Sequence, residues 1–201
     1  MGSASTDKVG LFRASIGLWS QDHNGNFIWD GPTIDKIYYL GGSANSSIIG
    51  DWNGDGRKKI GIYNNGIWYL DINGDGLFSS GIDKSFSWGI AGDRPIVGDW
   101  NGDGKEEIGL YRPSTGLWSL DYNGNFIWEP SIDKLFYWGS GGDTPIIGDW
   151  NGDGKAKVGF YRPSNGMYSL DYNGNFIWEP SIDKLFLWGP GGDMPIIGKW
   201  S

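Results

Sequence analysis

One short motif has the residue types and the spacing of a cation-binding loop. The heptapeptide Gly-Asp-Trp-Asn-Gly-Asp-Gly begins at Gly50, at Gly98 and at Gly148. Counted from the first Asp, oxygen-bearing side chains stand at positions 1, 3 and 5, and a Gly at position 6 allows a sharp turn. This pattern is the first half of an EF-hand-like loop, in which carboxylate, amide and carbonyl oxygens bind a hard cation. The first chemistry that the sequence predicts is therefore calcium binding.

The ninth position of the loop separates the three copies. Calcium takes six to eight oxygen ligands, so a main-chain carbonyl at position 7 and a carboxylate at position 9 would extend the set. Only the loop that starts at Asp99 has a carboxylate at position 9, whereas the other two loops have Lys59 and Lys157. The predicted ligands of this loop are Asp99, Asn101, Asp103, the carbonyl of Lys105, and Glu107.

The two loops with a lysine leave two alternatives open. Their candidate ligands are Asp51, Asn53 and Asp55 in one loop and Asp149, Asn151 and Asp153 in the other. The ammonium could replace the cation with an internal salt bridge, or it could point to solvent while water completes a calcium shell. We expect Ca2+ at the Asp99 loop and keep it as an alternative at the other two. A bound ion would be structural, because it gathers charges that otherwise repel and ties a hairpin together.

A second Asp-rich segment follows each motif by about twenty residues and also stands near the start of the chain. Its four copies begin at Asp22, Asp71, Asp121 and Asp171. Each contains Asn-Gly, the strongest short hairpin signal, so a turn is the default interpretation. Only the copy with Asp71, Asn73 and Asp75 resembles a metal loop, with Asp83 as a late ligand. Whether this copy forms a second kind of metal site stays open.

Short strands must position these loops. The sequence holds 36 Gly and 9 Pro among 201 residues, and no stretch free of both is long enough for a typical helix. Each repeat of about 50 residues contains four runs of β-branched and aromatic residues, here called A to D. In the best-conserved phase they are A at 144–149, B at 107–112, C at 117–121 and D at 134–138. Four antiparallel strands per repeat predict the blades of a β-propeller, with a linear solenoid as the rival.

The two ends of the chain complement each other in this scheme. The chain begins with B, C and D strands at 8–13, 18–22 and 37–40, and it ends on an A strand at 195–200. We therefore predict an all-β, four-bladed propeller of sixteen strands, formed by residues 8–201 as one domain and closed by the C-terminal strand. Residues 1–7 are expected to be tag-like or disordered. Whether one chain closes alone or two chains merge into a larger ring stays open.

Two further sets of side chains have a structural and a functional interpretation. Trp29, Trp128 and Trp178 follow the second turn in a polar loop. They could hold the loop down, or they could offer aromatic platforms to sugars. Arg112 and Arg162 each end a B strand. We expect these two side chains to be solvated or paired with an Asp of the loop between D and A.

Composition excludes several classes of protein. The net charge of −8 makes nucleic acid an unlikely partner, because phosphate binding depends on cationic side chains. No run of 18 apolar residues is present, so no membrane span is expected. Without Cys there is no thiolate catalysis or disulfide, and His23 is the sole histidine. No nucleophile, phosphate or dinucleotide motif occurs, so we predict that the protein is not an enzyme.

The segments Asp-Trp-Asn-Gly-Asp-Gly-Lys and Ile-Gly-Leu-Tyr-Arg-Pro-Ser-Thr-Gly-Leu-Trp resemble FG-GAP/VCBS-type repeats of bacterial and archaeal surface proteins. They resemble integrin α-subunit propeller repeats more distantly. The resemblance implies a propeller with calcium in the A–B hairpins, found in extracellular or cell-surface binding and adhesion proteins, some of them lectins. The lysines at position 9, and four repeats where seven blades are common, depart from that pattern.

We therefore expect a non-enzymatic, partly calcium-stabilised extracellular binding or adhesion propeller. Its ligand would be a protein or a glycan at a propeller face, and it would be a monomer or a small homo-oligomer. A multivalent carbohydrate-binding lectin is one alternative. Another is an engineered or amplified symmetric scaffold without an evolved ligand, because residues 121–136 and 171–186 are identical.

Overall fold

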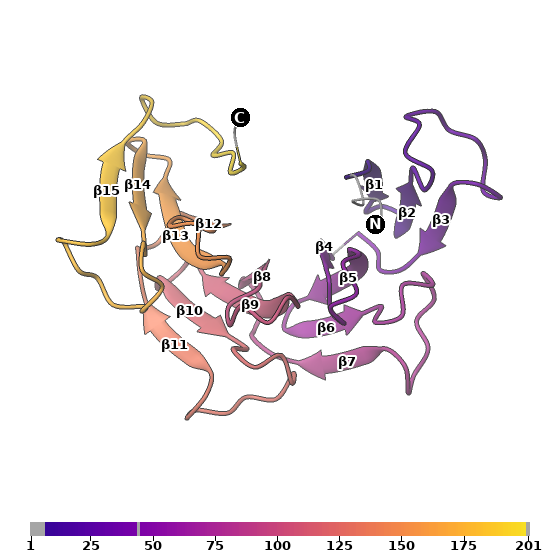
Figure 1. Ribbon diagram of the computed structural model, residues 1–201, viewed down its shortest axis with the longest axis horizontal. Coiled ribbons are helices and arrows are strands. Elements are labelled where there is room, and N and C mark those ends of the chain that lie inside the picture. Colours follow the sequence, from indigo (N-terminus) through magenta and orange to yellow (C-terminus); the bar gives the residue numbers. More distant parts are fainter. Residues whose placement is uncertain (1–6, 44, 200–201) are drawn as a thin grey trace. The chain divides into compact units, whose positions relative to one another are not determined.

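The protein is all β. The computed structural model describes residues 7–43 and 45–199, which form fifteen strands and no helix (Figure 1). Over that part of the chain there is accordingly no apolar helix of the length needed to cross a bilayer. The chain divides into two compact units, one ending at Trp88 and one beginning at Gly89. The tag-like segment expected at 1–7 lies outside the described residues except for Asp7.

Unit 1 contains two sheets. The first sheet consists of β1 (Gly10–Arg13), β2 (Leu18–Gln21) and β3 (Lys36–Tyr39). The second consists of β4 (Ser46–Gly50), β5 (Lys59–Asn64), β6 (Ile67–Leu70) and β7 (Lys84–Ser87). All neighbouring strands pair antiparallel and in chain order, as expected of strands joined by short Gly- and Asn-containing turns.

Unit 2 contains two sheets of the same design. The third sheet consists of β8 (Arg94–Gly98), β9 (Glu107–Arg112), β10 (Leu117–Leu120) and β11 (Lys134–Tyr137). The fourth consists of β12 (Thr144–Gly148), β13 (Lys157–Arg162), β14 (Met167–Leu170) and β15 (Lys184–Leu187). The predicted A, B, C and D runs are confirmed with boundaries that differ by at most two residues where strands form. The A strands β8 and β12 of this unit contact each other.

The predicted sixteenth strand does not form. The first sheet has three strands, and residues 195–199 of the expected A strand have no strand structure, while Trp200 lies outside the described residues. An A strand pairs only with the B strand of its own sheet, as β12 pairs with β13. In unit 2 both A positions are already filled by β8 and β12. Without a B-strand edge, segment 195–199 has no partner for its main-chain hydrogen bonds.

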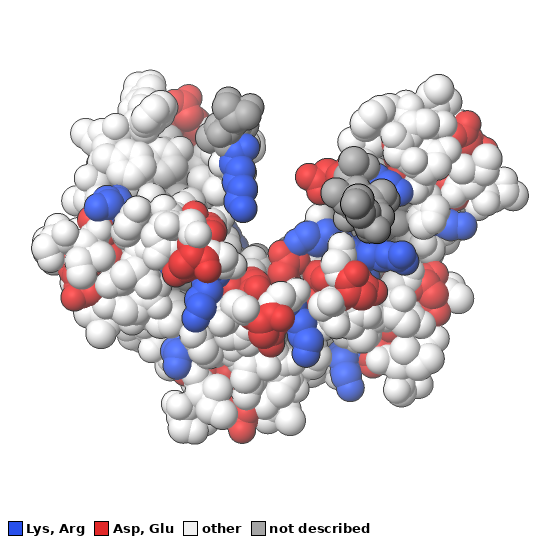
Figure 2. Space-filling model, viewed as in Figure 1, with Lys and Arg blue, Asp and Glu red and all other residues white. Residues whose placement is uncertain are grey.

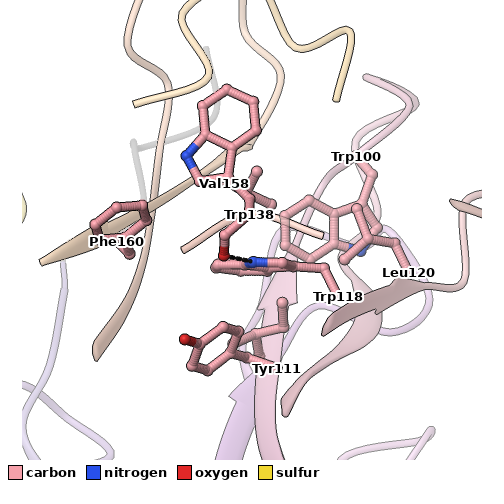
Figure 3. Close-up of a cluster of buried hydrophobic side chains, with 8 residues drawn as sticks. Trp100, Tyr111, Trp118, Leu120, Trp138, Val158 and Phe160 are labelled. Atoms are coloured by element: carbon pink, nitrogen blue, oxygen red, sulfur yellow. Dashed lines mark hydrogen bonds between the residues drawn. The ribbon is translucent and has the colours of Figure 1, made fainter. Parts of the chain in front are cut away.

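The core of unit 2 lies between its two sheets and is built from aromatic side chains (Figure 3). Trp118 and Tyr111, from paired positions of β10 and β9, are fully buried and contact each other with ring centroids 4.8 Å apart. Val158 and Phe160 of β13 belong to the same buried cluster, so the fourth sheet packs on the third. The Trp118 indole N–H donates to the main-chain oxygen of Trp138 at 2.8 Å, which satisfies its polar group inside the core.

Unit 1 repeats this arrangement. Trp19, Ile60 and Ile62 form its buried cluster, with Tyr38 and Leu40 packed against them. The Trp19 indole N–H donates to the main-chain oxygen of Leu40 at 3.0 Å. The tryptophans on C strands are therefore core residues in both units, where their flat side chains fill the space between successive sheets.

An ion pair joins the end of each B strand in unit 2 to the loop before the sheet's A strand. Arg162 donates to both carboxylate oxygens of Asp143 at 2.7 Å, and Arg112 binds Asp93 through both oxygens at 2.7 and 2.8 Å. Asp143 is buried and Arg162 is partly exposed. The expected pairing of these arginines with aspartates is confirmed.

Removing the arginine should destabilise the fold, because it leaves a buried carboxylate without its partner. We expect Arg162→Ala to lower the free energy of unfolding by roughly 2–3 kcal/mol, with solvent access to the pair keeping the loss below that of a fully buried one. Urea denaturation measures it. The control is Arg57→Ala, at an exposed position, and an equal loss in both variants would contradict a stabilising role for the pair.

Candidate metal centre

The three A–B loops have a common local structure that their first Asp organises. In the loop between β8 and β9, the Asp99 carboxylate accepts hydrogen bonds from the main-chain N–H groups of Gly102, Asp103 and Gly104, at 2.6, 3.1 and 3.0 Å. Gly104, at position 6, has a φ of 87°, which favours glycine. The main chain is thereby curled around the carboxylate, and the side chains at positions 1, 3 and 5 are brought to the same side of the loop.

Three carboxylates converge in the Asp99 loop. Asp99, Asp103 and Glu107 each offer an oxygen, and these oxygens lie within 4.8 Å of one another. This is the one group of three or more acidic, His or Cys side chains within the described ranges that could hold a metal ion. Asn101 and Lys105 flank it in the same loop, where the Lys105 N–H donates to Asp103 and leaves its carbonyl as a candidate ligand. The donor set is entirely oxygen, which suits calcium.

Glu107 is the unusual member of this group. It is the first residue of β9 and only 1% of it is exposed. One oxygen, Oε2, accepts the main-chain N–H of Trp100 at 3.0 Å, whereas the buried Oε1 has no hydrogen-bond partner. Burial raises the pKa of the Glu107 carboxyl to about 8, and the nearby Asp103, Asp99 and Asp121 raise it further against the Trp100 hydrogen bond.

In the loop between β4 and β5, a lysine ammonium occupies the place where the loop oxygens meet. Lys59 Nζ donates to Asp51 at 3.2 Å, Asn53 at 2.6 Å, Asp55 at 2.7 Å and the main-chain oxygen of Arg57 at 2.9 Å. These are positions 1, 3, 5 and 7, the oxygens expected to bind calcium. The hydrogen bond from the ammonium, more than any other contact, lowers the pKa of Asp55.

The loop between β12 and β13 is built in the same way. Lys157 Nζ donates to Asp149 at 3.2 Å, to Asp153 at 2.5 Å and to the main-chain oxygen of Lys155 at 3.1 Å. The Lys157 hydrogen bond lowers the pKa of Asp153 to about 2. Asn151 instead donates from its amide to Asp153. Of the two alternatives for these loops, the structure favours the internal ion pair over calcium, because the buried ammonium fills the position of the cation.

The A–B and C–D loops of a sheet lie at the same end of it. The Asn101 side-chain amide donates to the main-chain oxygen of Tyr122 at 3.1 Å, and Asn53 makes the equivalent bond to Ile72. Asp121, which opens the C–D loop, adds to the negative surroundings of Glu107, and burial raises its own pKa to about 6. Figure 2 shows acidic and basic side chains adjoining on the face in view, in keeping with loops in which lysine and aspartate alternate as partners.

The C–D loops use their aspartates to bind main chain. Asp121 accepts the N–H groups of Gly124 and Phe126, at 3.0 and 2.9 Å. Asp133, at the far end of the loop, accepts those of Tyr122 and Glu129, at 2.9 and 2.6 Å. Two buried carboxylates thus clamp each loop from both ends, and the turn interpretation of this segment is supported.

The copy that resembled a metal loop follows the same pattern. Asp71 accepts the N–H groups of Gly74 and Gly76, and Asp83 accepts those of Ile72 and Ser79, at 2.6–2.8 Å. Asp71, Asp75 and Asp83 do not form a converging acidic group in this structure. The carboxylate oxygens of Asp83 are engaged by main-chain donors, so the structure does not support the hypothesis of a second kind of metal site here.

The clamp predicts a specific loss of stability. In Asp133→Asn, one oxygen of the pair becomes an N–H donor that faces a main-chain donor, so a buried N–H group loses its acceptor. We expect a loss of about 2–3 kcal/mol in the free energy of unfolding, measured by thermal and urea denaturation. The control is Glu129→Ser, which copies the second repeat, where Ser79 stands. A control as damaging as Asp133→Asn would show that the clamp is not the stabilising feature.

The tryptophans of the C–D loops lie half exposed beside this network. Trp178 contacts the buried Trp138 edge to face at 5.5 Å, which fits the interpretation that it holds the loop down. Trp128 and Trp178 are 39% and 40% exposed, so part of each indole remains open to solvent. The Glu179 carboxylate accepts both Asn173 and Asn175 amides nearby in the chain.

Sequence reasoning missed two features of this end of the sheets. It considered Asp83 as a ligand, and it did not single out Asp35, Asp133 and Asp183, which stand at the same place and also clamp their loops. The signal was available, because an Asp precedes each D strand, before Lys36, Lys84, Lys134 and Lys184. It also did not anticipate that position 9 of the A–B loop is buried. That burial follows from the B strand, whose first residue lies inside the sheet stack.

Comparisons with known proteins give no relative for this chain. No family model, no curated protein and no solved structure matches it.

Proposed function

We propose that this protein is a non-enzymatic, extracellular binding or adhesion β-propeller whose Asp99 loop binds one calcium ion. The observation that carries the calcium proposal is Glu107, a buried carboxylate with an unpartnered oxygen beside two other carboxylates. A buried charged group of this kind is costly unless a counter-charge is present. In the sister loops a lysine ammonium supplies that charge.

The ligands in the proposed site are the side chains of Asp99, Asn101, Asp103 and Glu107 and the carbonyl of Lys105. Calcium would supply positive charge and no reaction chemistry. The ion would tie β8 and β9 together across their hairpin, as Lys157 does for β12 and β13 through its contacts with Asp149 and Asp153. One ion per chain, not three, is the stoichiometry that this arrangement implies.

Calorimetric titration of the chelator-treated protein with CaCl2 tests the proposal, with Tb3+ luminescence sensitised by Trp100 as a second readout. We expect one site per chain. No binding, or three equivalent sites, would contradict the assignment of calcium to the Asp99 loop.

A gain-of-function variant gives an independent test. Lys157→Glu places in the fourth sheet the same position-9 residue that the third sheet has, so it should add a second calcium site per chain. Without calcium the variant should melt at a lower temperature than the wild type, because the ammonium that pairs with Asp149 and Asp153 is lost. The control Lys155→Glu changes the charge equally at an exposed side chain and should leave the stoichiometry at one. Stoichiometry of one in both variants would count against the role of position 9.

The four sheets are, in this proposal, the blades of a propeller in which the C-terminal segment supplies the A strand that a first sheet lacks. Support comes from the repeated sheet order and from the contact of the A strands β8 and β12 within unit 2. The extracellular and adhesive role rests on the resemblance of the repeats to FG-GAP/VCBS-type surface proteins. Binding of the calcium-loaded protein to cell surfaces, compared with Glu107→Lys, tests that role.

A lectin is the second candidate, and one observation favours it. The half-exposed indoles of Trp128 and Trp178 recur beside amide and carboxylate groups of the same loop, an arrangement that offers both an apolar face and hydrogen-bonding groups to a sugar. A glycan array probed with the wild type and with Trp128→Ala/Trp178→Ala distinguishes the two candidates. Glycan binding that the double variant loses would favour the lectin.

A further inference from the structure

The chain carries both halves of its own sheet-to-sheet interface at positions where neither half is covered. Within unit 2, the segment at β11 that ends in Trp138 packs against the fourth sheet. The Trp138 indole N–H donates to Ser169 Oγ at 3.0 Å, and its ring contacts Trp178. Phe136 contacts Phe176 with ring centroids 4.9 Å apart. Figure 3 shows Trp138 with Val158 and Phe160, the β13 residues of the same cluster.

One half of this interface recurs, uncovered, at the end of the fourth sheet. Phe186 and Trp188 occupy the positions of Phe136 and Trp138 in the repeat, and we call them the β15 face. Trp188 is 75% exposed, whereas Trp138 is 5% exposed. The difference is confined to this side of the strand, because Leu187 is exposed and so is its equivalent Tyr137.

The other half recurs, uncovered, on the first sheet. Val9, Leu11, Phe27 and Trp29 occupy the positions of Val158, Phe160, Phe176 and Trp178, and we call them the β1 face. Val9 is 58% and Phe27 is 74% exposed, whereas Val158 is fully buried. Ser20 stands where Ser169 accepts the Trp138 indole N–H. The β1 edge of the same three-stranded sheet also lacks an A-strand neighbour.

The main chain supports the interpretation that the β1 face is built for contact. Phe27 has a φ of 62°, a left-handed conformation that is unfavourable for a bulky residue. Phe176 has the same conformation, with a φ of 65°, and there it packs against Phe136 and Tyr122 of the third sheet. The first sheet therefore holds Phe27 in the conformation that places such a ring against a preceding sheet.

From these two faces we propose that the protein associates head to tail with a second copy of itself, with the β15 face of one copy seated on the β1 face of the other. The occupant follows from complementarity, because each face is half of an interface that the chain already forms between its third and fourth sheets. A single copy leaves both faces exposed to solvent. Segment 195–199, which bears the exposed Ile196 and follows β15 directly, then lies close enough to pair with the β1 edge of that copy. The contact is heterologous, since different surfaces of the two copies meet. The proposal extends the proposed propeller and does not depend on the calcium site.

Sedimentation velocity over a concentration series tests this association, and the chain offers matched controls. Trp188→Ser and Phe27→Ser each remove one face, whereas Leu187→Ser and Ile28→Ser change neighbouring residues that are exposed in the equivalent repeats as well. All four variants alter exposed side chains, and circular dichroism checks that they fold. We expect the wild type and both controls to form dimers or larger species, and the two face variants to sediment as monomers.

Mixing the two face variants is the decisive step. Trp188→Ser keeps an intact β1 face and Phe27→Ser keeps an intact β15 face, so an equimolar mixture should form dimers although each variant alone does not. A wild type that stays monomeric at every concentration would overturn the proposal. In that case, lower melting temperatures of the two face variants but not of the controls would identify closure within a single chain. Face variants that associate like the wild type, or a mixture that stays monomeric, would also overturn it.

Discussion

Glu107→Lys is expected to abolish calcium binding at the Asp99 loop and to stabilise the protein in the absence of metal. The substitution exchanges a buried carboxylate for the ammonium that Lys59 and Lys157 present to the same loop oxygens. At an effective dielectric constant near 20, one pair of unit charges about 4 Å apart interacts by roughly 4 kcal/mol before desolvation. Reversing the charge at position 9 should therefore weaken calcium binding by at least about 100-fold and raise the metal-free stability by several kcal/mol.

Calorimetric titration and thermal denaturation with and without chelator measure the two effects. The wild type should gain stability on addition of calcium, whereas Glu107→Lys should melt at one temperature in both conditions. Glu106→Lys is the control, because it makes the same change at the neighbouring position and should keep the calcium response. Equal affinities in the wild type and in Glu107→Lys would mean that the A–B loops are turns without a cation site.

Without calcium, the protein is expected to lose stability as the pH rises from about 4.5 to about 8. Burial raises the pKa of Glu107 from 4.5 to about 8 in the folded protein. Between these values the folded state binds a proton that the unfolded state has released, so the contribution of this carboxyl is fully present below pH 4.5 and is lost as the pH rises through 8. At 1.36 kcal/mol per pKa unit, the loss approaches roughly 5 kcal/mol.

Asp121 contributes with the same sign at lower pH, because burial raises its pKa to about 6. The interval from pH 6 to pH 8 therefore reports mainly on Glu107. Urea denaturation at several pH values, with chelator, should show a falling stability in this interval for the wild type and a much flatter profile for Glu107→Gln. Saturating calcium should flatten the wild-type profile as well, because calcium binds the ionised carboxylate. A wild-type profile that rises between pH 6 and pH 8 would contradict the buried, protonated state of this group.

The sequence by itself determined the local structure. Gly, Pro and Asn-Gly turns interrupt the chain so often that only short strands can form, and alternating apolar and polar residues decide which face of each strand is buried. For this reason the boundaries of β9 and β10 could be predicted closely. The oxygen ligands at positions 1, 3 and 5 of the A–B loop were also readable, because their spacing within one turn is a local property.

Only the tertiary structure decided what occupies position 9 and what it does there. Glu107, Lys59 and Lys157 are all buried, because the start of the B strand lies within the stack of loops, and no local pattern shows that. The direction of the lysines was likewise undetermined from sequence, since a long flexible side chain can point to solvent or return to its own loop. The neighbouring carboxylates settle it by attracting the ammonium.

The strand at the C-terminus shows the same division between local and tertiary information. Segment 195–199 has the composition of an A strand, yet it forms no strand in the structure, whereas β12, with a similar sequence, pairs with β13 along its whole length. A β-strand exists only where another strand offers hydrogen-bond partners, so its composition is not sufficient. What the sequence determined is the capacity of this segment to pair, and the packing of whole sheets decides whether an edge is within its reach.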